Sequence, residues 1–216
     1  MAAAELGLRE RKKERTRQLL ADTARRLFSE RGFEQVSVAE ITRAAEVSSA
    51  TVFNYFPNKE DLVYSRLETF EEQLLTAIRD RPRGETVIAA FRRFVLEPRG
   101  LLAATDEETA NELTSLTRMI AASPALLARD QQIFARYTDA LAKLIADETG
   151  AGAGDLRQYV VANALIGVHR SLIAYARRRI QAGTPDRRRL GRDTRERGAK
   201  ALALLADGLG DYAPKH

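Results

Sequence analysis

Cysteine is absent from this chain of 216 residues, and histidine occurs only at positions 169 and 216. The lack of cysteine excludes disulfides and thiolate metal sites. Because His169 lies in no recognisable motif, neither a metal centre nor a hydrolytic site is expected. The glycine-rich stretch 150–154 is not followed by Lys-Ser or Lys-Thr, as a phosphate-binding loop would be. We therefore expect no catalytic residues, no metal ion and no cofactor.

Long hydrophobic runs are absent as well. No stretch approaches the roughly 20 apolar residues that a membrane-spanning helix needs. The first residues contain no uninterrupted apolar segment of the signal-peptide type. A soluble, cytoplasmic protein without membrane partners is therefore expected.

Aromatic residues make up only 6% of the chain, and β-branched residues are sparse outside a few positions, which argues against β-sheets. Alanine, leucine, arginine and glutamate dominate instead, and these residues favour helices. We expect an all-α fold, which glycine and proline punctuation divides into about nine helices.

The first sixty residues predict a compact set of short helices. An apolar stripe predicts a helix from about Arg9 to Glu30, which ends at Gly32. Ser37 and Glu40 are spaced as a capping box, and Ser48 is placed to cap a third helix that ends before Pro57. Asn58 then begins a fourth helix, about 33 Å long at 1.5 Å per residue, that continues to the Arg81-Pro82 region.

The third predicted helix carries the strongest functional signal. Its N-terminal residues, Ser48-Ser49-Ala50-Thr51, are small and mostly polar. The recognition helix of a helix-turn-helix protein inserts this end into the major groove, where large side chains would hold the backbone away from the bases. The sequence therefore predicts that this protein binds double-stranded DNA.

Positive charge is clustered although the net charge is only +5. Six cations fall within residues 9–17, next to the predicted DNA reader, and we assign them to phosphate contacts. A second cluster runs from Arg177 to Lys200, and we interpret it as a solvated helix face.

Residues 14–74 resemble the DNA-binding domain of the TetR family of transcriptional regulators. The resemblance rests on the first-helix stripe and then, with spacing intact, on Gly32-Phe33, Ser37-Val38-Ala39-Glu40-Ile41, Ala44-Ala45, Val47-Ser48, Thr51-Val52-Phe53, Tyr55-Phe56 and Lys59-Glu60-Asp61-Leu62. It implies a helix-turn-helix motif at 37–56 and a ligand-binding and dimerisation domain at 75–210. The segment from Val52 to Pro57 is also similar to regulators of the mycofactocin type.

The resemblance implies a set of DNA contacts. Base edges are expected to meet Ser49, Ala50 and Phe53, with Ala39 nearby, and phosphates are expected to meet Ser37, Thr51, Tyr55 and Lys59. Ser48 and Asn54 complete the predicted interface. Phe56 is assigned to the core instead. No Arg, Lys or Gln lies between Ser48 and Asn58, so DNA shape and the N-terminal arm are expected to contribute to specificity.

Position 46 departs from the family pattern, which usually has glycine in the turn between the second and third helices. Glu46 stands there. If the turn needs a left-handed residue, the glutamate costs roughly 1–2 kcal/mol.

The last two predicted helices, Leu156–Gln181 and Asp186–Ala206, have smooth apolar faces. One face contains Val160, Val161, Ala164, Leu165, Val168 and Leu172, and the other contains Ala199, Leu202, Ala203, Leu205 and Ala206. The resemblance implies that such helices form a four-helix homodimer interface. Packing within one chain is the alternative interpretation.

The resemblance also implies a small-molecule effector. Candidate polar anchors on mostly apolar helices are Asn111, Thr114, Arg118, Tyr137, Asn163, His169 and Arg170. Arg118 suits an acidic ligand, whereas the mycofactocin-type similarity suggests an acyl thioester or another hydrophobic ligand.

These features together predict a ligand-responsive repressor that binds a palindromic operator as a homodimer and is not an enzyme. An activator of the same family is one alternative. A small-molecule-binding protein or enzyme with a vestigial DNA-binding head, or a non-specific DNA-compacting protein, are the others.

Overall fold

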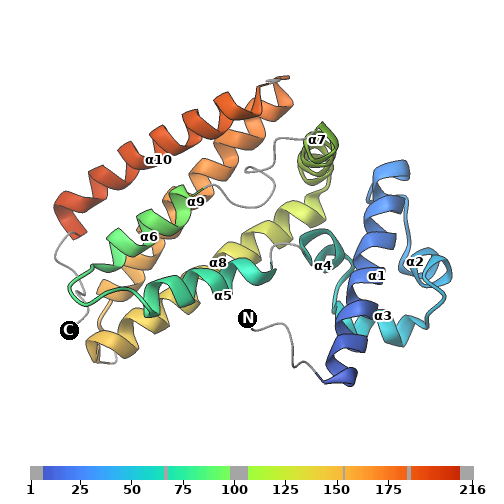
Figure 1. The fold of residues 1–216 in the computed structure, drawn as a ribbon, viewed down its shortest axis with the longest axis horizontal. Coiled ribbons are helices and arrows are strands. Elements are labelled where there is room, and N and C mark those ends of the chain that lie inside the picture. The colour runs from blue at the N-terminus through green and yellow to red at the C-terminus, as the bar shows by residue number, and fades with distance from the viewer. Residues whose placement is uncertain (1–6, 66–67, 98–106, 153, 184–185, 210–216) are drawn as a thin grey trace. The chain divides into compact units, whose positions relative to one another are not determined.

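The computed structural model describes residues 7–65, 68–97, 107–152, 154–183 and 186–209 (Figure 1). Within these ranges the chain forms ten helices and no strand, which confirms the predicted all-α class. The helices are α1 (Leu8–Arg31), α2 (Val38–Ala44), α3 (Ser49–Tyr55), α4 (Lys59–Tyr64), α5 (Glu68–Arg79), α6 (Val87–Leu96), α7 (Glu107–Ala122), α8 (Pro124–Thr149), α9 (Arg157–Gln181) and α10 (Arg187–Leu209).

The fourth predicted helix is described as two. The sequence predicts one helix from Asn58 to about residue 80, and the structure has α4 and α5 in that range, with residues 66–67 outside the described ranges. For this reason the described residues form ten helices, whereas the sequence predicts about nine. A continuous apolar stripe gave no local signal for two elements.

The chain divides into two compact units. The first contains Met1–Glu68 together with Met119–Leu126, and the second contains Thr69–Arg118 and Leu127–His216. The end of α7 and the start of α8 therefore pack with the N-terminal helices. Two hydrogen bonds hold them there: Ser123 Oγ donates to the carboxylate of Glu34, and the buried Tyr64 hydroxyl donates to the carbonyl of Leu126 at 2.8 Å.

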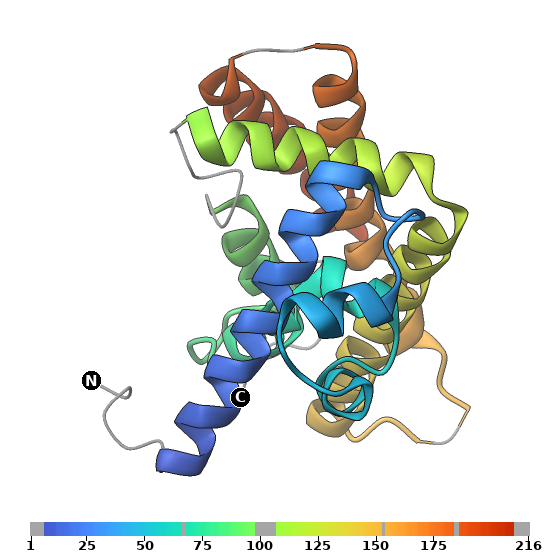
Figure 2. The ribbon, with the colours of Figure 1, turned by 90° about the vertical axis from the view of Figure 1, so that its right-hand side faces the viewer.

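The first unit is built on α1, against which α2 and α4 pack (Figures 1 and 2). Its buried apolar side chains come from every short helix of the unit: Leu20, Ala24, Phe28, Val36, Ile41, Val52, Phe56 and Leu62. Phe56, the last residue before Pro57, is fully buried, as predicted. This core supports the exposed faces of α2 and α3.

The second unit is organised around α9 and α10, which pack against each other and against α6. Gly198 lies where α10 approaches these helices, and a Cβ added there would come within 2.6 Å of Leu96 and 3.0 Å of Leu172. Of the eleven apolar residues predicted as a dimer face, four are buried within the single chain: Val161, Leu165, Leu172 and Leu202. The large apolar residues exposed on these helices or next to them are Leu156, Tyr159, Val160 and Leu204.

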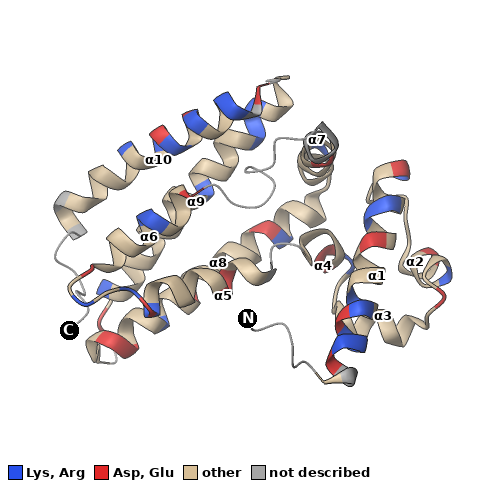
Figure 3. Ribbon diagram, viewed as in Figure 1, with Lys and Arg blue, Asp and Glu red and all other residues tan. Residues whose placement is uncertain are grey.

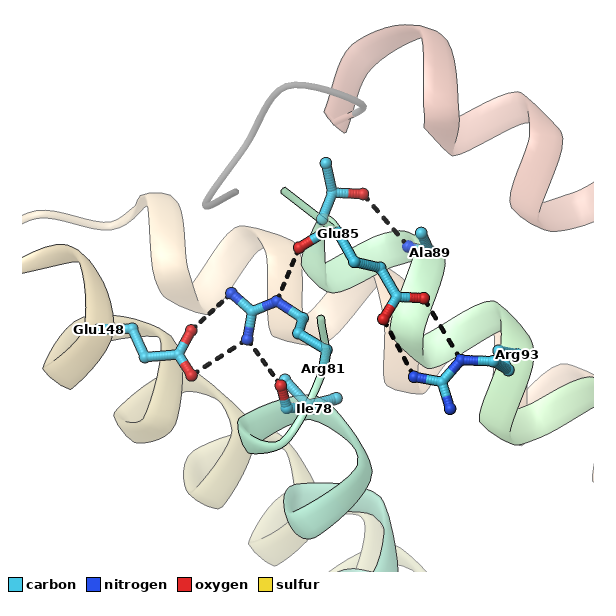
Figure 4. A network of polar contacts seen from close by, with 7 residues as sticks. Ile78, Arg81, Glu85, Ala89, Arg93 and Glu148 are labelled. Atoms are coloured by element: carbon cyan, nitrogen blue, oxygen red, sulfur yellow. Dashed lines mark hydrogen bonds and ion pairs between the residues drawn. The ribbon is translucent and has the colours of Figure 1, made fainter. Parts of the chain in front are cut away.

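A buried arginine ties the end of α5 to the end of α8 (Figure 4). The side chain of Arg81 is only 1% exposed and forms a two-pronged ion pair with Glu148, at 2.6 Å and 3.1 Å. It also donates to the carbonyls of Ile78 at 2.7 Å and Glu85 at 2.9 Å. These bonds fix the turn between α5 and α6.

Candidate functional site

The candidate DNA-binding surface is formed by α2 and α3. The first turn of α2 is fixed by the predicted capping box. Ser37 Oγ accepts from the amide of Glu40 at 3.2 Å, while the Glu40 carboxylate accepts from the Ser37 amide at 2.8 Å and from the Ser37 hydroxyl at 2.9 Å. Arg31 pairs with the same carboxylate at 2.7 Å. The Ser37 amide, followed by Arg31, lowers the pKa of Glu40 to about 2. The cap therefore stays ionised at neutral pH.

The turn between α2 and α3 passes through Glu46, whose φ is +55°, in the left-handed region. Among the described non-glycine residues it alone has a positive φ. The amide of the next residue, Val47, donates to the carbonyl of Thr42 at 3.0 Å and closes the turn. The turn therefore does need a left-handed residue, which was the condition stated for a cost at Glu46. Glu46 occupies a position that favours glycine.

We expect Glu46→Gly to stabilise the protein. Relief of the left-handed cost, roughly 1–2 kcal/mol, exceeds the entropy that glycine adds to the unfolded chain, so the net gain should be about 0.5–1 kcal/mol. Urea denaturation should show the gain, with DNA affinity unchanged. The control is Glu46→Ala, which removes the charge but keeps the Cβ. Equal stability of the two variants would contradict this account of the turn.

Helix α3 is short and sharply bounded. Ser48 caps it as predicted, because its Oγ accepts from the amide of Thr51 at 3.1 Å. Val52, 1% exposed, and the fully buried Phe56 anchor it to the core. The opposite side is open: Ser48, Ser49, Ala50, Phe53 and Asn54 are exposed, whereas Thr51 and Tyr55 are partly exposed.

The structure brings four of the predicted DNA-contact residues onto one exposed side of α3. Ser49, Ala50, Phe53 and Asn54 follow the i, i+1, i+4, i+5 spacing of a single helix side. The side chain of Phe53 is 49% exposed. On the preceding helix, Ser37 and Ala39 are also exposed.

Lys59 has a different setting from the one its predicted phosphate contact implies. Its ammonium donates to the carbonyl of Phe33 at 2.6 Å and lies 3.9 Å from the centre of the Phe33 ring. Burial lowers the pKa of this lysine. In the free protein Lys59 therefore ties the start of α4 to the loop after α1, so a phosphate contact would have to share or replace this bond.

The N-terminal half of α1 carries the first predicted cluster of cations. Arg11, Lys12, Lys13 and Arg15 are exposed there. Arg17 is partly buried, with its guanidinium 4.6 Å from the centre of the Phe56 ring. The helix thus presents several cations to solvent in the same unit as α3 (Figure 3).

The predicted effector anchors fall into two groups. Asn111, Arg118, Asn163 and Arg170 are exposed, and the Asn163 amide donates to the carbonyl of Tyr159 on its own helix at 2.8 Å. Thr114 is partly exposed. Tyr137 and His169 point inward instead, so the structure does not bring the seven residues together.

Tyr137 and His169 belong to an aromatic cluster inside the second unit, which also contains Phe70, Phe94 and Phe134. Phe70 of α5 stacks on the imidazole of His169, with centroids 4.5 Å apart and planes at 8°. The centroid of the Phe70 ring also lies 5.4 Å from those of Phe94 and Tyr137. The centroids of the Phe134 and His169 rings are 6.0 Å apart. Burial raises the pKa of Tyr137 to about 12 and lowers that of His169 to about 4.

The buried position of His169 predicts that the folded protein loses stability in acid. Its pKa is about 4 in the folded protein and near 6.5 in the unfolded chain, so the unfolded chain binds more protons between these values and stability falls as the pH drops through this window. Linkage puts the loss at about 2 kcal/mol by pH 5. Urea midpoints at pH 7 and pH 5 measure it. His169→Phe should keep the stacking and lose this part of the pH dependence, and an unchanged pH dependence in that variant would contradict the prediction.

The sequence patterns identified neither Phe134 nor Phe70 as a member of this cluster. The signal for Phe134 is its i, i+3 spacing from Tyr137, which places both rings on one side of α8. Phe70 carried no comparable signal, because its partner His169 is 99 residues away.

The described residues contain no group of three or more His, Cys, Asp or Glu side chains arranged to hold a metal ion. No described helix combines the length and the apolarity that crossing a membrane requires.

Comparison with known families gives two matches. Residues 20–64 match the family described as "Bacterial regulatory proteins, tetR family", and residues 85–209 match the "MftR C-terminal domain". The first match contains the capping box, the turn and α3. The second spans α6 to α10.

Curated relatives agree with these matches. The transcriptional regulator TcmR of Streptomyces glaucescens is 32% identical over 154 residues, which are 69% of this chain and 67% of TcmR. The putative mycofactocin biosynthesis transcriptional regulator MftR of Mycobacterium tuberculosis is 27% identical over 172 residues, 76% of this chain and 80% of that protein. Both carry the name of transcriptional regulators, MftR as a putative one.

Solved structures share the fold at low sequence identity. NalD of Pseudomonas aeruginosa, the secondary repressor of the MexAB-OprM efflux pump, has a TM-score of 0.55 and 21% identity, covering 87% of this chain and 97% of NalD. GusR of Salmonella enterica has a TM-score of 0.52 and 18% identity, covering 90% and 95%.

Proposed function

Because this chain belongs to the TetR family of bacterial transcriptional regulators, we propose that it is a ligand-responsive repressor that acts as a homodimer on a palindromic operator. The observation that carries the proposal is the exposed, small and polar N-terminal face of α3, held over the buried Val52 and Phe56. Residues 14–74 would supply DNA binding, and residues 75–210 would supply effector binding and dimerisation.

The geometry supports distinct roles for the exposed residues. Ser49, Ala50 and Phe53, with Ala39 beside them, would meet base edges: a phenylalanine or alanine suits a thymine methyl group, and a serine can donate or accept. Ser37, Thr51, Tyr55 and Lys59 would lie against the phosphate backbone. Ser48 and Asn54 would flank the groove contacts. The cations of α1 would add sequence-independent affinity.

Homodimerisation is supported by the apolar residues that α9 and α10 leave exposed. Leu156 is 69% exposed, Val160 61% and Leu204 81%. Burial of such side chains against a second copy removes apolar surface from water, which is favourable. A two-fold dimer would present two α3 helices to half-sites separated by about 34–36 Å or its multiples.

An effector of mainly hydrophobic character fits the aromatic cluster better than an acidic one. The cluster offers ring faces and edges, and the imidazole of His169 has no hydrogen-bond partner among the described residues. Arg118, the candidate for an acidic ligand, is exposed. A hydrophobic ligand that hydrogen-bonds to His169 would change DNA binding only through a difference in its affinity for the DNA-binding conformer and another one.

The test is a selection from random duplexes with the full chain, followed by competition between the selected duplex and a scrambled one. A specific regulator should prefer the selected sequence by at least roughly 10³ at physiological salt. The selected sequence should be a palindrome, bound by two chains as measured by sedimentation. Equal affinity for every duplex would overturn the proposal in favour of a non-specific DNA-binding protein.

A further inference from the structure

A second concentration of positive charge in this chain lies far from the DNA-binding unit in sequence. Residues 177–200 contain ten Lys or Arg and three Asp or Glu, a net charge of +7, whereas the first cluster, residues 9–17, contains six Lys or Arg and two Glu, a net charge of +4. Figure 3 shows this charge along the N-terminal half of α10 and the adjoining end of α9. Both belong to the second unit.

We define the basic tip as the exposed arginines at this end of the α9–α10 pair: Arg178, Arg188, Arg189, Arg192 and Arg195. Three of them, Arg188, Arg192 and Arg195, have i, i+4, i+7 spacing on α10. They therefore form one row that extends about 10 Å along the helix.

The neighbouring cations make contacts within the fold, whereas several arginines of the basic tip do not. Arg177 forms a two-pronged pair with Asp130, at 2.7 and 2.9 Å, Arg197 lies over the Tyr175 ring, and Lys200 pairs with Glu196. In contrast, the guanidinium groups of Arg178, Arg188 and Arg192 form no hydrogen bond or ion pair with any described residue. The remaining two make only weak contacts: Arg189 lies 4.0 Å from Asp193, and Arg195 donates to the carbonyl of Leu96 at 3.2 Å.

Folding stability gives little reason for these charges. Helix α10 begins with Arg187-Arg188-Arg189, and the acidic residue at this end is Asp186, whose carboxylate accepts from the amide of Arg189 at 3.1 Å. Cations at a helix N-terminus are unfavourable, because the helix dipole is positive there. Only the arginines in the last turn of α9 have a favourable dipole interaction. A row of closely spaced arginines also repels itself, so an anionic partner accounts for it better than the fold does.

We propose that the basic tip binds the phosphate backbone of duplex DNA outside the operator, as a second, sequence-independent contact. Arginine is the side chain best suited to phosphate, and a rigid row on a helix suits a periodic polyanion. An anionic membrane is a poorer fit, because surface-binding helices also insert apolar side chains. The exposed large apolar residues of α9 and α10 lie instead near the opposite ends of these helices: Leu156, Tyr159, Val160 and Leu204.

This contact goes beyond the proposed function and does not require α3 to read bases. Each contact can be removed alone. Ser49→Glu places a carboxylate on the exposed face of α3, whereas replacing Arg178, Arg188 and Arg192 by Gln removes three of the five charges of the tip. A failure of operator recognition and a failure of the tip contact can therefore be distinguished.

The test measures binding of the full chain to a 40-base-pair duplex without the selected operator, by fluorescence anisotropy over a series of NaCl concentrations. Neutralising three phosphate-contacting arginines should lower affinity at least about tenfold at 50 mM NaCl and reduce the slope of log K against log salt by up to about 3 per protomer. The loss should be the same in the Ser49→Glu background. Replacing the three arginines by Lys should restore most of the affinity.

The matched control replaces three exposed cations of the same unit, Arg83, Arg92 and Lys143, by Gln. It changes net charge equally and should leave the salt slope almost unchanged. Equal losses in the two triple variants would overturn the proposal, because net charge alone would explain them. Unchanged DNA binding of the tip variant would also overturn it, and tip-dependent binding to phosphatidylglycerol vesicles in that case would assign the surface to membranes.

Discussion

Ser49→Glu should abolish operator binding while leaving the protein folded. Ser49 is exposed in the first turn of α3, next to the capping Ser48. A carboxylate at a helix N-terminus interacts favourably with the helix dipole, so the melting temperature should stay level or rise slightly. At the DNA the same carboxylate would face phosphates and base acceptors. Like charges in a contact cost several kcal/mol, which corresponds to a loss of at least about 100-fold in affinity.

The measurement is the dissociation constant for a duplex selected by the unsubstituted protein. Ser29→Glu is the matched control, because it adds the same charge to another exposed serine, on α1 and outside the predicted interface. The control should bind within about threefold of the unsubstituted protein, less than 1 kcal/mol. If Ser49→Glu bound equally well, the N-terminal end of α3 would not enter the groove.

Arg81→Met should produce the largest loss of stability. Methionine fills a similar volume but leaves the Glu148 carboxylate and the carbonyls of Ile78 and Glu85 without their donor. Breaking a buried pair costs about 3–5 kcal/mol. Since the Glu148 side chain is 24% exposed, water compensates in part and we expect about 3 kcal/mol. Urea denaturation followed by far-ultraviolet circular dichroism measures the loss.

A neighbouring pair in the same network provides the control (Figure 4). Arg93 pairs with Glu85 at 3.0 Å, but its side chain is 54% exposed, so Arg93→Met should cost less than about 1 kcal/mol. The double variant Arg81→Met, Glu148→Leu should recover much of the loss, because it removes the unpaired carboxylate as well. Equal losses for Arg81→Met and Arg93→Met would contradict the role assigned to burial.

The local features of the reading unit could be predicted from sequence because each depends on residues a few positions apart. The Ser37–Glu40 box, the Ser48 cap and the end of α3 before Pro57 all involve separations of three residues or fewer between the groups concerned. The strained turn was also predictable, since a missing glycine pointed to Glu46 and its φ is positive.

The long-range features could not be predicted in this way. Arg81 reads as a helix-end cation, and its partner Glu148 lies 67 residues away. The polar anchors proposed for an effector were chosen from residue type alone, and only packing decides that Asn111 and Arg118 face solvent while Tyr137 lies inside. The inclusion of Met119–Leu126 in the first unit depends on contacts with Glu34 and Tyr64, for which no local pattern exists.

The central claim is that the exposed face of α3 reads bases, and a scan of single-base substitutions across the selected half-site tests it most directly. The scan should be measured with the unsubstituted protein and with Phe53→Ala, which removes an exposed ring. The account predicts that the variant loses a preference of about 1–3 kcal/mol at one or two neighbouring base pairs and keeps the others. A uniform loss at every position, or an unchanged profile, would contradict it.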